Sequence, residues 1–164
     1  MRQDKFRKNI LPIIDKLFRL ALSITGNKED AEDVVQDVLL NIWRKNELWD
    51  TIENIEAYCF RSTRNIALDK ISLRDNQNDS IPENFDYPLI EDDIQKKLED
   101  RERIDQLENW IGKLPEKQQT IFRLREVEEF SYKEIAEIMG VSEEQVKVNL
   151  FRSRQKLKEY FENN

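Results

Sequence analysis

Histidine is missing from this 164-residue sequence, and cysteine occurs only once. The usual zinc sites are built from Cys and His, so they cannot form here, and the commonest general base of enzymes is missing as well. The three glycines lie far apart, which excludes a glycine-rich phosphate-binding loop. We therefore predict a protein that is not an enzyme and that holds neither a metal nor a cofactor.

Long apolar runs are also missing. The sequence has no stretch of about 18 apolar residues and no charged-then-apolar amino terminus followed by a small-residue cleavage site. We therefore expect a cytoplasmic protein without membrane insertion. The one cysteine, Cys59, cannot form an intramolecular disulfide and lies in a helical pattern, so we interpret it as a core residue.

Charge and periodicity divide the chain into three parts. Charged residues make up 37% and apolar residues 38% of the sequence, which is typical of a helix-rich protein with thin cores. Residues 76–100 contain two lysines against eight carboxylates, and their first half has almost no periodicity. We predict an all-α protein with two small helical domains, residues 1–75 and 93–164, joined by a flexible acidic linker at residues 76–92.

The first domain is predicted to hold three helices. Pro12 falls inside the first apolar pattern, residues 6–21, so that helix either begins near Pro12 or kinks there. Asn27 is expected to cap a second helix, whose apolar stripe runs over residues 31–42. A third helix is expected over residues 55–73, after a loop.

Two polar sets on these helices are candidate binding sites. The second helix carries Asp33, Gln36 and Asp37 outside its apolar stripe, and on composition alone they could simply be its solvated face. The third helix carries an aromatic residue beside cations, a combination that can stack on unpaired bases while neutralising phosphates. Its members are Tyr58, Arg61, Arg64 and Asn65, of which Tyr58 could equally be a core residue.

Two capping boxes bracket a glycine in the last third of the chain. Ser131 with Glu134 opens one predicted helix, and Ser142 with Gln145 opens the next. Gly140 lies between them and can adopt the left-handed conformation that a tight turn between helices needs. This spacing predicts a helix-turn-helix in the C-terminal domain.

The second helix of this motif is basic, although the chain as a whole carries a net charge of −7. Residues 145–158 contain five cations and no carboxylate. A helix fits the DNA major groove, where Gln and Asn pair with adenine, and Arg and Lys pair with guanine or phosphate. The predicted DNA contacts are Gln145, Lys147, Val148, Asn149, Phe151, Arg152, Arg154 and Lys156. The alternative is a solvated cationic helix end, which the helix dipole would favour.

Taken together, these segments resemble the extracytoplasmic-function (ECF) class of bacterial RNA polymerase sigma factors. The resemblance rests on residues 30–38, 58–69, 114–119 and 131–142, in this order along the chain. It implies a specificity subunit that binds core RNA polymerase and recognises the −10 and −35 elements of promoter DNA. It also suggests an anti-sigma factor as a further partner, and we expect the free protein to be a monomer.

The resemblance assigns a role to each polar set. Asp33, Gln36 and Asp37 would contact the clamp of the largest polymerase subunit, the helix with Tyr58 would engage the melted −10 element, and residues 46–54 would receive a flipped base. The basic helix would read the −35 element. Two positions depart from the family: Tyr58 stands where Trp is usual, and Val148-Asn149 replaces a common Ser-Arg pair.

One other class of protein remains open. A conventional DNA-binding regulator would share the helix-turn-helix and would use its first domain for dimerisation or sensing. Such a regulator has no reason to carry both the 30–38 and the 58–69 segments. An enzyme is disfavoured by the missing catalytic constellation.

Overall fold

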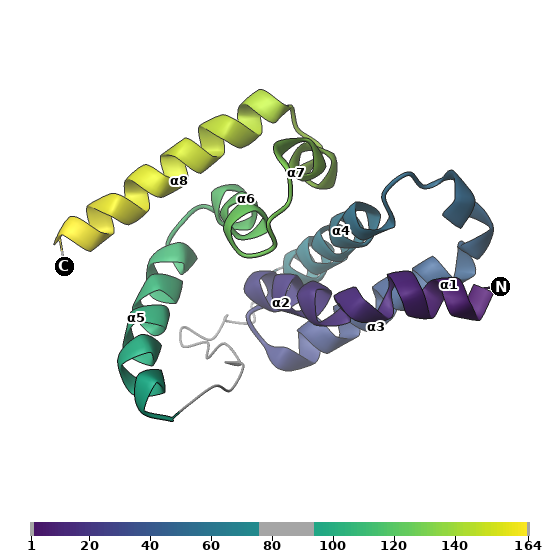
Figure 1. The fold of residues 1–164 in the computed structure, drawn as a ribbon, viewed down its shortest axis with the longest axis horizontal. Coiled ribbons are helices and arrows are strands. Elements are labelled where there is room, and N and C mark those ends of the chain that lie inside the picture. Colours follow the sequence, from purple (N-terminus) through teal and green to yellow (C-terminus); the bar gives the residue numbers. More distant parts are fainter. Residues whose placement is uncertain (1, 76–93, 164) are drawn as a thin grey trace. The chain divides into compact units, whose positions relative to one another are not determined.

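The computed structural model describes residues 2–75 and 94–163, and all regular structure in these two ranges is helical (Figure 1). The helices fall into two compact units, the first with α1–α4 and the second with α5, α6, α8 and the larger part of α7. The all-α prediction is confirmed. The predicted linker, residues 76–92, lies outside the described residues, and the predicted domain boundaries stay a prediction.

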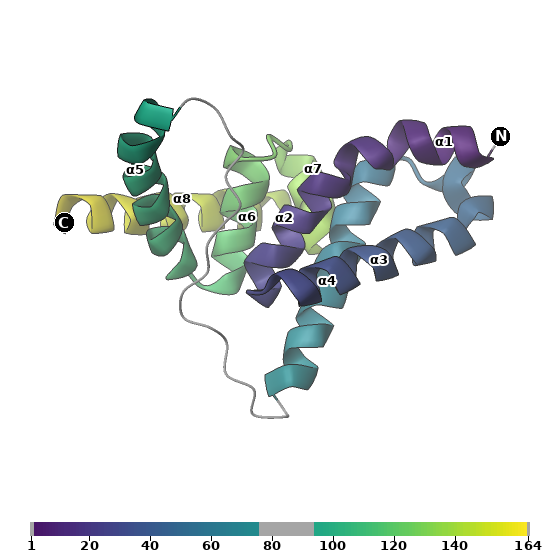
Figure 2. The ribbon, with the colours of Figure 1, turned by 90° about the horizontal axis from the view of Figure 1, so that it is seen from below.

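The first unit is a bundle in which α2, α3 and α4 pack against one another (Figure 2). Its elements are α1 (Arg2–Asn9), η1 (Leu11–Ile13), α2 (Ile14–Thr25), α3 (Lys28–Arg44), η2 (Asn46–Thr51) and α4 (Ile55–Asp75), where η denotes a 3₁₀-helix. Each of the three packed helices contributes fully buried side chains to one core, among them Leu17, Val34 and Phe60. Burying a large apolar side chain of this kind contributes about 1.5–3 kcal/mol.

Local sequence signals set the helix ends in this unit. Pro12 lies in the short η1 turn between α1 and α2. The helix is therefore interrupted at the proline and begins again at Ile14, instead of continuing with a kink. Gly26 ends α2 in the left-handed conformation, with φ of 78°. The Asn27 side chain accepts a hydrogen bond of 2.8 Å from the Asp30 backbone N–H, which confirms the predicted cap of α3.

The second unit consists of α5 (Ile94–Gly112), α6 (Glu116–Glu126), α7 (Tyr132–Met139) and α8 (Glu143–Asn163). The long helix α8 packs against α6 and also contacts α5 (Figure 2). Arg123 on α6 is buried and forms two hydrogen bonds, of 3.1 and 2.7 Å, to the Glu108 carboxylate on α5. A bidentate pair of this kind fixes the angle between two helices as well as their distance.

The segments just before α6 and α4 set where these helices begin. Pro115 immediately precedes α6: its ψ of 145° is extended, and the helix begins at Glu116. The loop expected around Trp49 is instead the 3₁₀-helix η2, held in place by the buried Trp49 ring. None of the described helices is long and apolar enough to cross a membrane.

Candidate functional site

The helix-turn-helix forms as the two capping boxes predict. The Ser131 hydroxyl accepts the Glu134 backbone N–H at 3.1 Å, and the Glu134 carboxylate accepts the Ser131 N–H at 3.0 Å. Ser142 and Gln145 exchange the same two bonds, at 3.2 and 3.3 Å, at the start of α8. Between the two helices, Gly140 has a φ of 67°, so the turn uses the left-handed conformation expected for it.

The core face of α8 is narrow, and most of the predicted DNA-contacting residues lie outside it. Val146, Leu150 and Ser153 are buried against the rest of the second unit. The outward positions include two apolar residues, since Val148 is 45% exposed and Phe151 is 62% exposed. Lys147 and Arg152, beside them in the sequence, are exposed as well. The structure therefore brings an apolar pair and two cations together on the free side of this helix.

Three other predicted DNA contacts already have partners within the chain. The Asn149 side-chain amide donates to the Gln145 backbone carbonyl at 2.7 Å, and the Gln145 side chain caps α8 through Ser142. Arg154 donates to the Glu126 carboxylate on α6 at 2.6 and 3.2 Å. The hydrogen bond to Glu126 raises the pKa of Arg154 above its ordinary value. Lys156 is half-buried.

Sequence reasoning missed Tyr132 and Arg125, two residues near the amino end of α8. The Tyr132 ring, at the start of α7, has the Arg125 guanidinium 4.6 Å from its centre and the Lys147 ammonium 5.8 Å from it. Cations over an aromatic ring are attracted by its negative face, so Tyr132 holds two positive groups close to the amino end of α8. The capping box marked Tyr132 as a helix start, but nothing in the sequence indicated which cations would reach its ring.

The four predicted −10 contacts on α4 differ in their exposure to solvent. Tyr58, Arg61 and Asn65 follow one another at helical spacing of three and four, so they share one face. Arg61 and Asn65 are exposed and Tyr58 is half-buried, with its hydroxyl accepting a hydrogen bond of 3.4 Å from the Lys45 ammonium. Arg64 is half-buried beside this face. The opposite side of α4 is core, with Phe60 and others fully buried.

The segment before α4 is anchored by Trp49. The buried indole N–H of Trp49 donates to the Ile42 carbonyl at 2.8 Å, and the ring lies 6.2 Å from Phe6 on α1. The residues that follow, 52–56, line a mostly polar cavity of about 540 Å³ between α1, α2 and the start of α4. Its lining includes Lys8, Lys16, Glu53 and Asn54. The predicted base-capturing segment, residues 46–54, thus borders an open space with both cations and hydrogen-bonding groups.

The outward face of α3 carries Asp33, Gln36 and Asp37, all of them exposed. It continues into an apolar groove of about 470 Å³ between α1 and α3. Leu40, 51% exposed, and Trp43, 40% exposed, line this groove together with Phe6, Gln36 and Leu39. Sequence reasoning found the acidic part of this face but missed its apolar part, because the spacing of Leu40 falls outside the core stripe.

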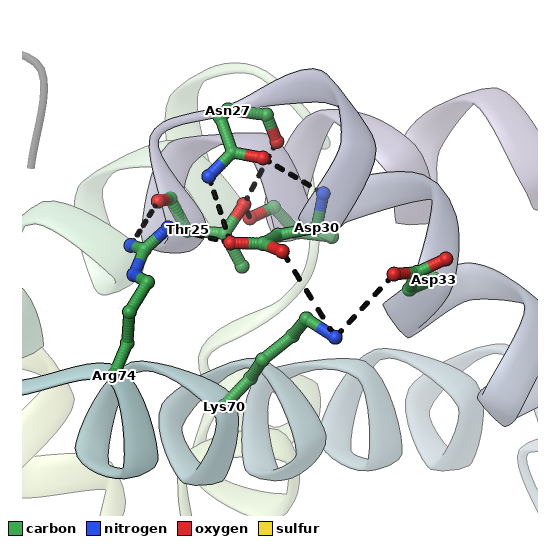
Figure 3. A network of polar contacts seen from close by, with 7 residues as sticks. Thr25, Asn27, Asp30, Asp33, Lys70 and Arg74 are labelled. Carbon is green, nitrogen blue, oxygen red and sulfur yellow. Dashed lines mark hydrogen bonds and ion pairs between the residues drawn. The ribbon is translucent and has the colours of Figure 1, made fainter. Parts of the chain in front are cut away.

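The amino end of α3 is bound to α2 and α4 by a polar network (Figure 3). Arg74 on α4 donates to the Asp30 carboxylate and, at 2.6 Å, to the Thr25 carbonyl at the end of α2. Lys70, one turn earlier on α4, lies 3.5 Å from the Asp33 carboxylate and 4.0 Å from that of Asp30. The network orients α3 relative to α4, which carries the other candidate site of this unit.

The single cysteine of the chain is a buried core residue. Cys59 is fully buried in the first unit, and its burial raises the thiol pKa to about 12, so the thiol stays protonated and unreactive at neutral pH. This agrees with its interpretation as a core residue. Within residues 2–75 and 94–163, no group of three or more His, Cys, Asp or Glu side chains is arranged to hold a metal ion.

Comparison with known families assigns each half of the chain. Residues 13–78 match the family model of sigma-70 region 2, and residues 104–157 match that of sigma-70 region 4. Together the two matches cover well over half of the chain. The first falls on the unit built from α1–α4, and the second falls on the unit that contains the helix-turn-helix.

Similar proteins with known names agree. The chain is 28% identical over 148 residues to the ECF RNA polymerase sigma factor SigE of Mycolicibacterium smegmatis, covering 89% of this chain and 57% of that protein. It is 26% identical over 145 residues to the ECF RNA polymerase sigma factor SigM of Bacillus subtilis, covering 88% of each. The chain thus spans little more than half the length of SigE and most of SigM.

Two solved structures with the same fold are complexes with a second protein. The sigma factor RpoE in complex with the anti-sigma factor NepR from Bartonella quintana has a TM-score of 0.78, with 23% identity and 96% of each chain covered. CnrH in complex with the cytosolic domain of CnrY has a TM-score of 0.67 and 21% identity, over 99% of this chain and 90% of CnrH. At these identities the likeness establishes the fold alone.

The two units therefore define a two-domain protein of the sigma-70 kind, with region 2 ahead of region 4. The chain belongs to the ECF class of RNA polymerase sigma factors, which direct promoter-specific transcription initiation and are not enzymes. This confirms the resemblance seen in the sequence.

Proposed function

We propose that this chain binds core RNA polymerase through the outward face of α3 and directs it to promoters by means of α4 and α8. The observation that carries the proposal is the order of the two matched regions, each coinciding with one compact helical unit. Each unit presents an exposed polar face on a helix whose other face is buried. Two weak readers on one chain bind a promoter jointly better than either alone, because the first contact raises the effective concentration of the second.

The α3 face suits a protein partner. Exposed carboxylates at Asp33 and Asp37 lie beside the exposed apolar side chains of Leu40 and Trp43. Protein interfaces combine an apolar centre with a polar rim, whereas the DNA backbone would repel the two carboxylates. We assign core polymerase to this face, with Asp33, Gln36 and Asp37 as contacts.

The α4 and α8 faces suit nucleic acid. We assign the −10 element to Tyr58, Arg61, Arg64 and Asn65, where an aromatic ring stands beside cations and near the polar cavity at residues 52–56. We assign the −35 element to the exposed positions of α8, which has no carboxylate over residues 145–158. Arg154, paired with Glu126, would have to exchange that carboxylate for a phosphate to take part.

The partners and the compartment complete the proposal. Two solved relatives are bound to protein partners, in one case to the anti-sigma factor NepR, and we infer that this chain has an anti-sigma partner as well. We also infer that it acts in the cytoplasm, where polymerase and promoter DNA are found, and that it is a monomer when free.

The experiment is reconstitution. The full-length chain is mixed with core RNA polymerase, the complex is isolated by size exclusion, and its transcripts from a library of genomic fragments are mapped at their 5′ ends. A one-to-one complex with defined start sites supports the proposal. A chain that stays apart from a competent core enzyme and binds a palindromic duplex as a dimer would contradict it, and would indicate a conventional regulator.

A further inference from the structure

The exposed face of α8 includes two neighbouring apolar residues. Val148 and Phe151 are 45% and 62% exposed, and they lie three positions apart on α8, so they are neighbours on one face. The buried residues of α8, Val146, Leu150 and Ser153, lie at other positions of the helical repeat. A single exposed apolar residue is ordinary on a protein surface. Two together on the helix assigned to the DNA groove call for a physical role.

Two amide residues of the same helix, Gln145 and Asn149, are engaged within the fold. An Asn side chain can read adenine by using both its amide donor and its carbonyl acceptor. Here the Asn149 amide donates to the Gln145 carbonyl at 2.7 Å, and the Gln145 side-chain oxygen accepts the Ser142 N–H at 3.3 Å. Both side chains therefore stabilise the first turns of α8. This leaves the apolar pair as the more prominent feature of the outward face.

Charge indicates what the apolar pair meets. Lys147 and Arg152 are exposed beside it, and no carboxylate occurs from residue 145 to residue 158. The acids Glu143 and Glu144 are confined to the first turn, where they favour the helix dipole. An apolar patch between cations fits a surface that combines apolar groups with phosphates. The DNA major groove is such a surface, because each thymine presents its C5-methyl group there.

We propose that Val148 and Phe151 form a patch that reads thymine methyl groups in the −35 element, with Lys147 and Arg152 holding the flanking phosphates or guanines. This inference rests on the proposed function and adds a specificity determinant to it. The patch would favour A·T over G·C pairs at the contacted positions through apolar contact. The polar residues Gln145 and Asn149 would serve to shape the helix.

The test removes the methyl groups from the DNA and the apolar groups from the protein. The holoenzyme formed by the full-length chain and core polymerase selects its best promoter from a duplex library randomised over the −35 window. That promoter is then synthesised with either thymine or deoxyuridine in the window alone. Deoxyuridine pairs with adenine as thymine does but lacks the methyl group. The measured quantity is the ratio of the two dissociation constants.

For the unaltered chain, the deoxyuridine promoter should bind about fourfold more weakly for each methyl group in contact. The double variant Val148→Ala with Phe151→Ala should bind the thymine promoter more weakly and give a ratio near one. Alanine favours helices, so the two substitutions do not weaken α8 itself. The control is Val127→Ala, which removes an exposed valine at the end of α6 and should keep the ratio of the unaltered chain.

Three results would overturn the inference. They are a selected window without A·T pairs, equal affinity of the unaltered chain for both promoters, and a double variant that keeps its methyl sensitivity while losing affinity for core polymerase. The last would make the patch a protein-docking surface. Failure of the proposed function would be seen separately, as the absence of a core complex, and the same selection and ratio would then be measured on the full chain alone.

Discussion

Helices α3 and α8 are built alike but present opposite surfaces. Each follows a left-handed glycine, Gly26 or Gly140, and each begins at a side-chain cap, Asn27 or Ser142. Each also buries a stripe of branched apolar residues. On the outward face of α3, carboxylates lie beside the exposed side chains of Leu40 and Trp43. On the outward face of α8, the apolar pair Val148 and Phe151 lies beside cations.

This difference separates the role of fold from the role of surface. The caps and buried stripes determine where the two helices begin and which side they bury. These features are of the same type in α3 and α8 and therefore do not determine the partner of either helix. The partner is determined by the charge beside the exposed apolar residues, since DNA attracts cations and repels carboxylates. The comparison can be sharpened by altering the elements that hold each helix and then the residues that each helix presents.

The largest expected effect concerns the anchoring of α3. Arg74→Ala removes the hydrogen bonds to Asp30 and Thr25 and should lower the free energy of unfolding of the first unit by about 2–3 kcal/mol, since both bonds involve a charged donor in a mostly buried place. The measurement is labelling of Cys59 by a thiol reagent, because this one buried cysteine lies in that unit.

The control for that prediction is Arg154→Ala in the second unit. Its ion pair with Glu126 is about half exposed, and such pairs contribute about 0–1 kcal/mol. Labelling of Cys59 should be faster in Arg74→Ala and unchanged in Arg154→Ala. Because the folded Cys59 thiol has a pKa near 12, only molecules in which the first unit has unfolded react with the reagent at pH 8. Raising the pH toward 12 favours the unfolded form, since the thiol ionises more easily there than in the folded unit. Unchanged labelling in Arg74→Ala would mean that the network does not hold the unit together.

The next effect concerns what α8 presents. Arg152→Ala should weaken binding of the holoenzyme to promoter DNA by about 1–3 kcal/mol, whether the side chain contacts guanine or phosphate. Promoter affinity at fixed salt concentration is the measurement, and its salt dependence tells phosphate contact from base contact. Arg103→Ala, an exposed arginine on α5, is the matched control. Equal losses in the two variants would remove Arg152 from the −35 site.

The smallest effect concerns the turns before the helices. A residue with positive φ precedes each of α3, α7 and α8. It is a glycine before α3 and α8, but before α7 it is Glu129, with a φ of 60°. Glu129→Gly should therefore stabilise the second unit by about 1 kcal/mol, and Gly140→Ala should destabilise it by a similar amount. A Cβ at Gly140 would meet no atom within 4 Å, so only backbone strain is tested there. Thermal unfolding midpoints that move in the same direction in both variants would contradict this account.

Local signals in the sequence were sufficient for the helices and their caps. Asn27, Ser131 and Ser142 bond to groups three residues away, so their roles follow from short patterns. The apolar stripe of α3 was predicted for the same reason, since it follows the helical repeat. The family resemblance then assigned roles that composition had left open, such as those of Asp33 and Asp37.

Contacts between distant segments could not be predicted in this way. Arg74 and Asp30 are 44 positions apart, and Arg154 and Glu126 are 28 apart, so no local pattern pairs them. The same holds for the two cations around Tyr132. Such a tertiary contact engages Arg154, one of the predicted site residues, with Glu126 on α6, and no local pattern in the sequence indicates it.

The most direct test of the central claim measures two affinities for two variants in parallel. Asp37→Ala on α3 and Arg152→Ala on α8 are each assayed for binding to core polymerase. Each is then saturated with core polymerase, and the holoenzyme is assayed for binding to promoter DNA. Glu32→Ala is the control on α3, because Glu32 is exposed beside the outward face. The account predicts that Asp37→Ala weakens core binding alone and that Arg152→Ala weakens promoter binding alone. Variants that lose both affinities together, or the reverse assignment, would contradict it.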